Sequence, residues 1–179
     1  MTVQNNKKKY KYHLLIVFIF AITFSCIVLH NVSLYNKIII VTGNSMYPTI
    51  KNGEIVLIKE RDYLIEQGDI VLIKYKESES LPLFYPHNKY LLKRVIGVGG
   101  NTVEISHIAN SVYVDGIRID EPYINYYDGD TTIKKGEPYT IVPAGYIYVL
   151  GDNRNNSFDS RNPELGLVSE DDVVGIVMK

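Results

Sequence analysis

One long apolar run lies near the start of the chain, and every later apolar run is short. From residue 14 to residue 29 the sequence reads LLIVFIFAITFSCIVL, without a charged residue. In a helix these sixteen residues rise about 24 Å at ~1.5 Å each, slightly less than the ~30 Å hydrocarbon core of a bilayer. Polar residues on both flanks can complete the crossing at the interfaces. We therefore expect a transmembrane helix over residues 14–32.

Four lysines precede this run, and no acidic residue occurs before Glu54; the four are Lys7, Lys8, Lys9 and Lys11. Basic flanks tend to stay on the cytoplasmic side of a membrane. We expect residues 1–13 to be a cytoplasmic basic N-terminus and residues 36–179 an extracytoplasmic domain, on a single-pass protein of the plasma membrane. A cleavable secretory signal has the same basic and apolar regions, but no A-x-A-like site follows this run, which favours the anchor.

Beyond residue 35 the apolar positions form short, β-branched runs between turn residues, a pattern typical of strands. Asp115–Gly116 is a two-residue hairpin signal. Because no long helix separates the runs, we expect an antiparallel, mainly β domain. We also expect a short helical turn within residues 60–67 and an exposed loop over residues 131–139, and residues 173–178 are too short to span a membrane. The expected strands are 38–41, 54–59, 69–75, 90–98, 101–106, 112–114, 117–119 and 146–150.

Charge and composition remove several function classes. The net charge is −1, and without the four N-terminal lysines 15 basic residues face 20 acidic ones, so general nucleic-acid binding is disfavoured. Cys26 is the only cysteine and lies in the apolar run, which excludes an intrachain disulfide and argues against thiol catalysis or a cysteine metal site. Two of the four histidines flank that run. His87 and His107 make no zinc motif and are more typical of surface or loop positions.

A serine can also be activated by a neutral lysine, whose pKa burial lowers. Lys93 is a candidate base, because strand alternation places it on one face with Leu91 and Val95. An exposed edge strand is the alternative interpretation of the adjoining Lys–Arg pair. Ser45 is the candidate nucleophile, in a turn soon after the apolar run. A plain surface turn is the alternative there, and the nucleophile elbow G-x-S-x-G does not match because Tyr47 replaces the second glycine.

Four segments, in order, resemble the sequence boxes of type I signal peptidases, the membrane-anchored Ser–Lys endopeptidases that release exported proteins. Residues 43–49 (GNSMYPT) resemble the nucleophile box S-M-x-P-T, and residues 93–97 (KRVIG) resemble the general-base box K-R-V-x-G. Residues 151–161 (GDNRNNSFDSR) resemble G-D-N-x-x-x-S-x-D-S-R, and residues 68–71 match the less specific G-D-[IV]-V. The resemblance runs from about residue 7 to the end, and the short distance between the last two specific boxes resembles the Gram-positive branch.

The resemblance implies a role for several side chains. Ser45 is the nucleophile, Lys93 the general base, and Ser157 hydrogen-bonds and orients the lysine amine. Asp159 and Arg161 form a supporting ion pair, with Asp152 and Arg154 also structural. The backbone N–H of Ser45 supplies one oxyanion donor.

Three positions depart from the family pattern. Gly43 stands where some members carry a hydroxyl residue as the second oxyanion donor, so that donor would be a backbone group or water instead. Asn155 stands where an aspartate is frequent, and residues 162–166 alter the stretch after the last box. Both catalytic residues are retained, so we expect an active enzyme.

The activity implied by the resemblance is cleavage of N-terminal signal peptides from preproteins after a small-x-small motif, without a metal or organic cofactor. Membrane lipid and the nearby export translocon are the other implied partners. The alternatives are a self-cleaving Ser–Lys repressor and a membrane-anchored binding module whose serine and lysine are incidental. From proximity to the dyad, we expect the substrate pocket to be lined by Met46, Ile39, Val41, Tyr90 and Leu92.

Overall fold

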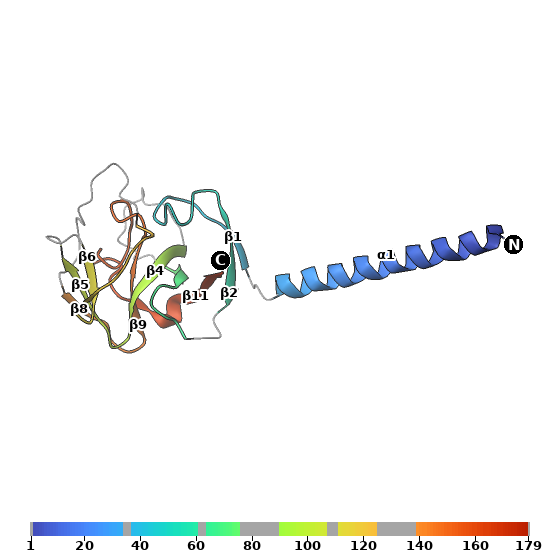
Figure 1. Cartoon of the computed structure of the whole chain (residues 1–179). Coiled ribbons are helices and arrows are strands. Elements are labelled where there is room, and N and C mark those ends of the chain that lie inside the picture. The colour runs from blue at the N-terminus through green and yellow to red at the C-terminus, as the bar shows by residue number, and fades with distance from the viewer. Residues whose placement is uncertain are drawn as a thin grey trace. The chain divides into compact units, whose positions relative to one another are not determined.

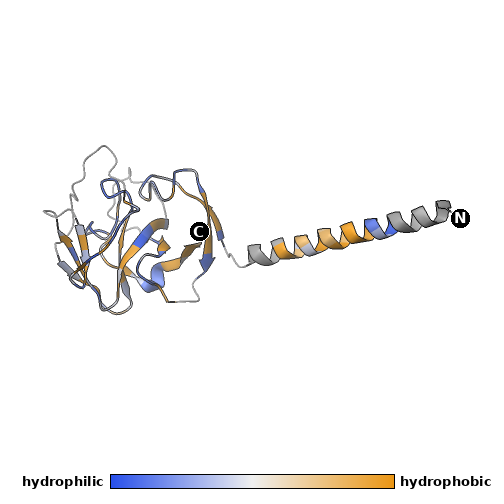
Figure 2. Ribbon diagram, in the orientation of Figure 1, coloured by the Kyte–Doolittle hydropathy of each residue, from blue (hydrophilic) through white to orange (hydrophobic). Residues whose placement is uncertain are grey.

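The computed structural model describes residues 2–33, 37–60, 64–75, 90–106, 111–124 and 139–178. It contains two compact units, Met1–Asn36 and Lys37–Lys179. The first unit is the helix α1 (Thr2–Ser33), whose middle is strongly apolar (Figure 2). Within the part of the chain that the structure describes, no helix combines the length and apolarity needed to cross a membrane. The segment expected to be a transmembrane helix is thus helical, and its crossing of a membrane stays a prediction.

The second unit is built from two antiparallel sheets (Figure 1). The larger sheet has the order β1-β2-β11-β3-β4-β9-β10, and the smaller has the order β7-β6-β5-β8. The strands of the larger sheet are β1 (Lys37–Ile40), β2 (Ile55–Glu60), β11 (Val173–Met178), β3 (Ile70–Lys74), β4 (Tyr90–Val98), β9 (Tyr146–Leu150) and β10 (Val168–Ser169). Those of the smaller are β7 (Ile117–Arg118), β6 (Ser111–Val114), β5 (Thr102–Ser106) and β8 (Tyr139–Ile141), and a short 3-10 helix, η2 (Glu170–Asp172), precedes β11.

The mainly β antiparallel fold is confirmed, and each of the eight expected strands is present within two residues of its predicted bounds. The hairpin between β6 and β7 turns at Asp115 and Gly116, both with positive φ (52° and 76°), the geometry that favours this residue pair. Among the strands in the described residues, three were not predicted: β8, β10 and β11.

Two local expectations were wrong where the structure describes them. Residues 64–67 form no helix, whereas residues 61–63 lie outside the described part. Tyr139 begins β8 instead of ending a loop, and residues 131–138 again lie outside the described part.

Strand β4 positions the site because it is buried on both faces over most of its length. Leu91 and Val95 pack into one hydrophobic cluster with β3, β9 and β11, while Leu92 packs into another with β1 and β2. Ile96 packs between the two sheets. Because β4 lies between β3 and β9, and Lys93 and Arg94 are both buried, the exposed-edge alternative for this pair does not hold.

Candidate active site

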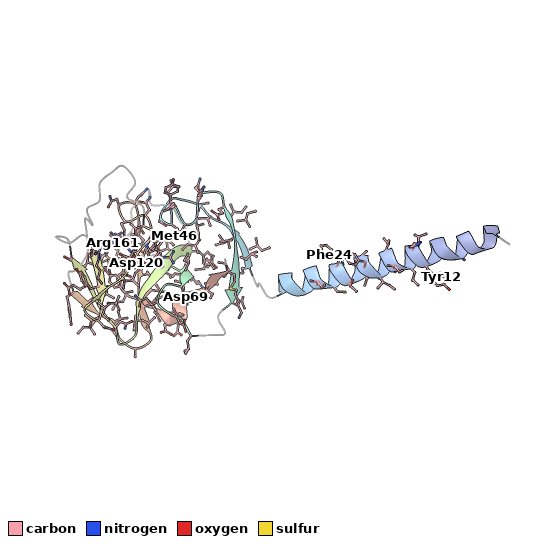
Figure 3. The ribbon with its side chains drawn as sticks, viewed as in Figure 1. Tyr12, Phe24, Met46, Asp69, Asp120 and Arg161 are labelled. Atoms are coloured by element: carbon pink, nitrogen blue, oxygen red, sulfur yellow. The ribbon has the colours of Figure 1, made fainter. Side chains whose placement is uncertain are left out.

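The candidate nucleophile lies in the turn that follows β1, which we call the serine turn (residues 43–50). Within it, the Tyr47 N–H donates to the carbonyl of Asn44 (3.1 Å) and the Ile50 N–H donates to that of Met46 (2.9 Å). Met46, labelled in Figure 3, is 2% exposed, so its side chain fixes the turn to the core beneath it. These contacts leave Ser45 on the side of the turn that faces β4 and a cavity.

The turn begins at a glycine for a conformational reason. Gly43 has φ +95°, in the left-handed region where a side chain is strained, and its N–H donates to the Asn52 side-chain oxygen (2.9 Å). A hydroxyl residue at this position would therefore be strained. Because the Gly43 N–H is occupied, it is not available as an oxyanion donor in this arrangement.

Lys93 and Ser45 meet directly. The Lys93 side chain is 2% exposed, and its Nζ lies 2.9 Å from Ser45 Oγ and 2.8 Å from the carbonyl oxygen of Leu92. Burial lowers the pKa of Lys93 from 10.5 to about 8; the nearby Asp159 and Asp152 carboxylates oppose this shift, and Arg161 adds to it. A useful fraction of the amine is therefore neutral near physiological pH. A neutral amine hydrogen-bonded to a serine hydroxyl is suited to general-base activation of that serine.

The loop of residues 151–161 holds the other side of the serine turn. Asn153 donates through its N–H to the Ser45 carbonyl (3.0 Å) and through Nδ2 to the Asn44 carbonyl (3.1 Å). Gly151 packs so closely that a Cβ there would overlap Ser157 Oγ and the Ser45 carbonyl oxygen. Among the described residues, the Ser45 N–H donates no hydrogen bond, so this donor is available for an oxyanion.

Asp159 and Arg161 form a buried ion pair within the same loop. Arg161 donates to Asp159 through Nε and Nη2, both at 2.7 Å, and the Gly151 N–H donates to the same carboxylate (3.0 Å). Burial by itself would raise the pKa of Asp159, but the hydrogen bonds and charge of Arg161 outweigh burial and lower it. Both members of the pair therefore stay charged. Because their opposite charges largely cancel, burial has the largest effect on the pKa of Lys93.

Ser157 does not make the hydrogen bond to Lys93 that the resemblance implies. Its Oγ is buried without a hydrogen-bond partner, although it lies near enough to Asp159 to help lower the pKa of that carboxyl. The Lys93 amine donates to Ser45 and to the Leu92 carbonyl instead. In this structure the Ser157 hydroxyl packs against Gly151, beside the serine turn.

A largely apolar cavity of about 680 Å³ opens at the Ser45–Lys93 pair. All five residues expected in the substrate pocket line it. It is also lined by Lys37, Leu72, Asn156 and Phe158, which sequence reasoning missed. Asn156 and Phe158 occupy the variable positions of their sequence box, so the motif gave no reason to select them. The ring of Phe158 is held edge-on by Tyr75, with centroids 5.5 Å apart.

No cluster of three or more potential metal ligands is present among the residues that the structure describes. His87 and His107 both lie outside those residues.

Comparisons with known proteins agree with the sequence boxes. The family described as "Signal peptidase, peptidase S26" matches residues 11–178. The chain belongs to this signal peptidase family. Signal peptidase I of Bacillus amyloliquefaciens is 39% identical over 145 residues, which cover 76% of this chain and 68% of the relative. Signal peptidase IB of Staphylococcus aureus is 35% identical over 153 residues, which cover 76% of this chain and 73% of the relative.

Among solved structures, the crystal structure of a signal peptidase I from Enterococcus faecalis V583 matches with a TM-score of 0.48 and 26% identity. The match covers 65% of this chain and 98% of the other. The family and its Bacillus and Staphylococcus relatives confirm the resemblance to type I signal peptidases of the Gram-positive type. The chain is thus a serine peptidase of the signal peptidase I kind, a hydrolase that cleaves signal peptides.

Proposed function

We propose that this signal peptidase is a single-pass enzyme of the plasma membrane that cleaves preproteins after small-x-small motifs, with Ser45 as nucleophile and Lys93 as general base. The observation that carries the proposal is the 2.9 Å contact between Ser45 Oγ and the buried Lys93 Nζ at the end of an apolar cavity. Burial supplies what a lysine base needs, because it disfavours the ammonium form.

The topology supports binding of an extended peptide beside this pair. Strand β9 begins to pair with β4 only at Arg94, and among the described strands β1 has a neighbour, β2, on one side only. Residues 90–93 of β4, apart from the Leu92 carbonyl that accepts from Lys93, and the outer edge of β1 therefore keep backbone groups available, and both line the cavity. A signal-peptide C-region can add there as a strand. Apolar walls formed by Ile39, Met46 and Leu92 accommodate small apolar side chains before the cleaved bond.

The chemistry then proceeds in two steps. Neutral Lys93 takes the proton from Ser45 Oγ as the oxygen attacks the scissile carbonyl carbon, and the Ser45 N–H donates to the oxyanion that forms. The protonated amine returns this proton to the leaving amine, which departs and leaves an ester on Ser45. Lys93 next takes a proton from water, the resulting hydroxide attacks the ester carbonyl, and the proton returns to Ser45 Oγ as the signal peptide leaves.

Membrane anchoring by α1 belongs to the same proposal. The apolar run of α1 and the four lysines before it support a cytoplasmic N-terminus and an extracytoplasmic catalytic unit. The substrate is itself held in the membrane until it is cut. Tethering both molecules to one surface, beside the lipid and near the export translocon, raises their effective concentration.

The test is cleavage of a preprotein by the full chain in lipid vesicles. We expect one new N-terminus after a small-x-small motif for the wild type and for Ser106→Ala, a control in the smaller sheet, and no product for Ser45→Ala. Mass spectrometry identifies the cut. Binding of the preprotein without any product would favour the binding-module alternative, and cleavage of the chain itself alone would favour the self-cleaving one.

A further inference from the structure

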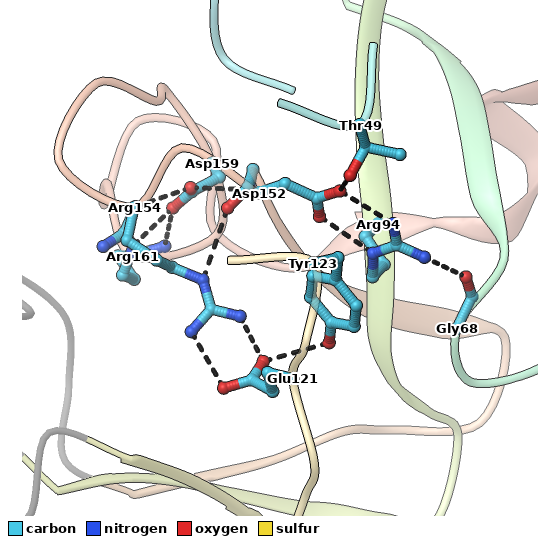
Figure 4. Close-up of polar contacts among 10 residues, drawn as sticks. Thr49, Gly68, Arg94, Glu121, Tyr123, Asp152, Arg154, Asp159 and Arg161 are labelled. Atoms are coloured by element: carbon cyan, nitrogen blue, oxygen red, sulfur yellow. Dashed lines mark hydrogen bonds and ion pairs between the residues drawn. The ribbon is translucent and has the colours of Figure 1, made fainter. Parts of the chain in front are cut away.

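A segment of four residues that follows β7 crosses from the smaller sheet to the neighbourhood of β4. We call this segment, Glu121–Pro122–Tyr123–Ile124, the strap. The strap contacts two arginines (Figure 4). The Arg94 guanidinium carbon lies 3.9 Å from the centroid of the Tyr123 ring, a cation–π geometry. Glu121 pairs with Arg154: it accepts from Nη1 at 3.2 Å and forms a short ion pair with Nη2. The Tyr123 hydroxyl donates to the same carboxylate (3.0 Å), so the strap is one connected unit.

The first arginine connects the strap to both catalytic residues. Arg94 follows Lys93 directly in β4, and its Nε and Nη2 donate to the two oxygens of Asp152, at 2.8 and 2.7 Å. Asp152 in turn accepts from the hydroxyl of Thr49, in the serine turn. Figure 4 shows Asp152 between Thr49 and Arg94, with the Tyr123 ring facing the guanidinium. The strap thus contacts Arg94, which together with Asp152 connects β4 to the serine turn.

The second arginine leads to the serine turn by another path. The Arg154 side chain is completely buried, and its Nε donates to the Gly151 carbonyl (3.3 Å). Gly151 packs directly against the Ser45 carbonyl oxygen. Through Glu121 and Arg154, the strap therefore bears on the loop that holds the serine turn.

The charges of this network depend on the strap. The nearly buried Glu121 carboxylate is the counterion of Arg154, and loss of its charge would leave a cation without compensation in the interior. Burial and the Glu121 charge raise the pKa of Tyr123, so its hydroxyl stays protonated and remains a donor. Burial by itself would lower the pKa of Arg94, but Asp152 outweighs burial and raises it, so this guanidinium stays charged against the Tyr123 ring.

We infer that Glu121 and Tyr123 are positioning residues of the Ser45–Lys93 site: they hold Arg94 and Arg154 and so fix the serine turn relative to β4. The inference rests on the proposed function and deepens it. Neither residue touches Ser45 or Lys93, so both act through the arginines. If the network loosens, the two reacting atoms lose their alignment and water reaches the amine, which returns the pKa of Lys93 toward its ordinary value.

The test compares Tyr123→Leu, which removes ring and hydroxyl, with Tyr123→Phe, which keeps the ring over Arg94. Glu121→Gln removes the charge at nearly constant size, and Asp120→Asn is the matched control, an exposed neighbouring carboxylate (labelled in Figure 3). The full chain in detergent is assayed for kcat, for KM and for the pH dependence of kcat/KM, at a temperature where each variant is folded. NMR titration of ¹⁵N-labelled lysine gives the Lys93 pKa independently of any activity.

We expect Tyr123→Leu and Glu121→Gln to lower kcat about tenfold or more, because small misplacements of reacting groups cost that much. KM should stay within about twofold, and the acid limb and the Lys93 titration should both move to higher pH. Tyr123→Phe should recover most of kcat, and Asp120→Asn should match the wild type. Lower melting temperatures with kcat and both titrations unchanged would overturn the inference. If the wild type cleaves no preprotein, the proposed function fails instead, and the NMR titration alone then decides the role of the strap.

Discussion

The amine of Lys93 can accept a proton because the interior around it disfavours the ammonium form more than nearby charges favour it. Two carboxylates, Asp159 and Asp152, raise its pKa, and each is already paired with an arginine. Burial therefore prevails, and the pKa falls to about 8. At the residue scale, the proposed mechanism depends on this balance between desolvation and two neighbouring ion pairs.

The pH dependence of cleavage follows from this balance. Below a pH of about 8 the Lys93 amine is increasingly protonated and cannot take the Ser45 proton, so kcat/KM should fall about tenfold for each pH unit on the acid side. Lys93→Ala should be folded and inactive at every pH. The profile is measured with a short signal-peptide substrate. A control with an exposed lysine changed, Lys51→Ala, should keep the wild-type profile, and an acid limb centred near pH 5 would contradict the role of Lys93.

The same buried amine should cost stability. At pH 7 the folded chain holds an ammonium whose pKa is about 8 against 10.5 in the open chain, a difference worth about 3 kcal/mol. Lys93→Met keeps the volume and removes the charge, so it should stabilise the fold by up to that amount at pH 7. Between pH 8 and 10.5 the unfolded chain binds more protons than the folded chain, so wild-type stability rises with pH and the advantage of the variant shrinks.

Urea unfolding of the full chain at pH 7 and pH 10.5, followed by circular dichroism, measures both differences. Lys51→Met is the control, because that side chain is exposed and its loss should change neither value by more than a few tenths of a kcal/mol. A Lys93→Met protein less stable than the wild type at pH 7 would show that the amine is not under a desolvation cost.

At the scale of elements, the site is the meeting of a central strand, a turn and a loop from distant parts of the sequence. Strand β4 carries Lys93, the serine turn carries Ser45, and the 151–161 loop closes over both with Asn153 bonded to two turn carbonyls. The closest approach is at Gly151, where the loop backbone rests on the turn backbone. The alignment of the dyad thus depends on a contact that admits no side chain.

Gly151→Ala should therefore damage the site beyond its effect on folding. The added Cβ meets the Ser45 carbonyl oxygen and Ser157 Oγ, so the turn must move, and we expect a loss of activity of about 100-fold or more. Gly175→Ala is the matched control: its Cβ meets the Lys59 carbonyl oxygen between β11 and β2, a comparable backbone collision outside the cavity lining. It should lower stability by about 3 kcal/mol and spare the kcat of the folded fraction.

Cleavage is measured per folded molecule, with the folded fraction taken from circular dichroism at the assay temperature. Equal losses of kcat in the two variants would mean that the contact at Gly151 has no special connection with the serine turn.

Sequence reasoning identified the parts of the site that carry chemical or conformational signatures. Ser45 and Lys93 stand in motifs whose residue types are needed for the reaction, and the alternation of β4 correctly placed Leu91 and Val95 in one cluster. Phe158 was missed because a cavity wall needs only bulk, which no fixed residue type encodes. Strand β11 was missed because the run that contains it was considered only as a membrane segment, and its sheet neighbours β2 and β3 are distant in sequence.

Long-range pairing explains the remaining failures. The Glu121–Arg154 pair joins residues 33 positions apart, and neither has a local pattern that names the other. Ser157 shows the opposite limit: its motif was recognised, but its hydroxyl packs against Gly151 without a hydrogen-bond partner, which no motif predicts. Motifs thus specify which groups are present, whereas contacts between elements decide which of them bond.

At the scale of the whole molecule, the two compact units differ in how they arrange their large apolar side chains. Helix α1 exposes an almost unbroken series of large apolar side chains along its described part. The β unit packs three clusters of buried apolar side chains, although it also leaves some exposed, among them Ile38, Ile40 and Ile55 on β1 and β2. Exposed apolar surface on that scale is costly in water. The proposed anchor resolves this cost, because lipid would cover the apolar part of α1 while the polar surface of the β unit remains in water.

Fractionation of cells that express the full chain tests the anchor. We expect the intact chain to stay with membranes after extraction at alkaline pH, because the proposed anchor would be held by lipid rather than by ionic contacts. In spheroplasts, added protease should digest the β unit and spare the N-terminus. A variant with Ile19 and Ile22 changed to Lys should be released by the same extraction, because each charge within the apolar run costs about 2–3 kcal/mol or more.

Mass spectrometry of the N-terminus separates the remaining alternative, a cleaved secretory signal. A mature protein that begins after residue 29 would mean a cleaved signal, and an intact chain in the soluble fraction would exclude membrane anchoring by α1.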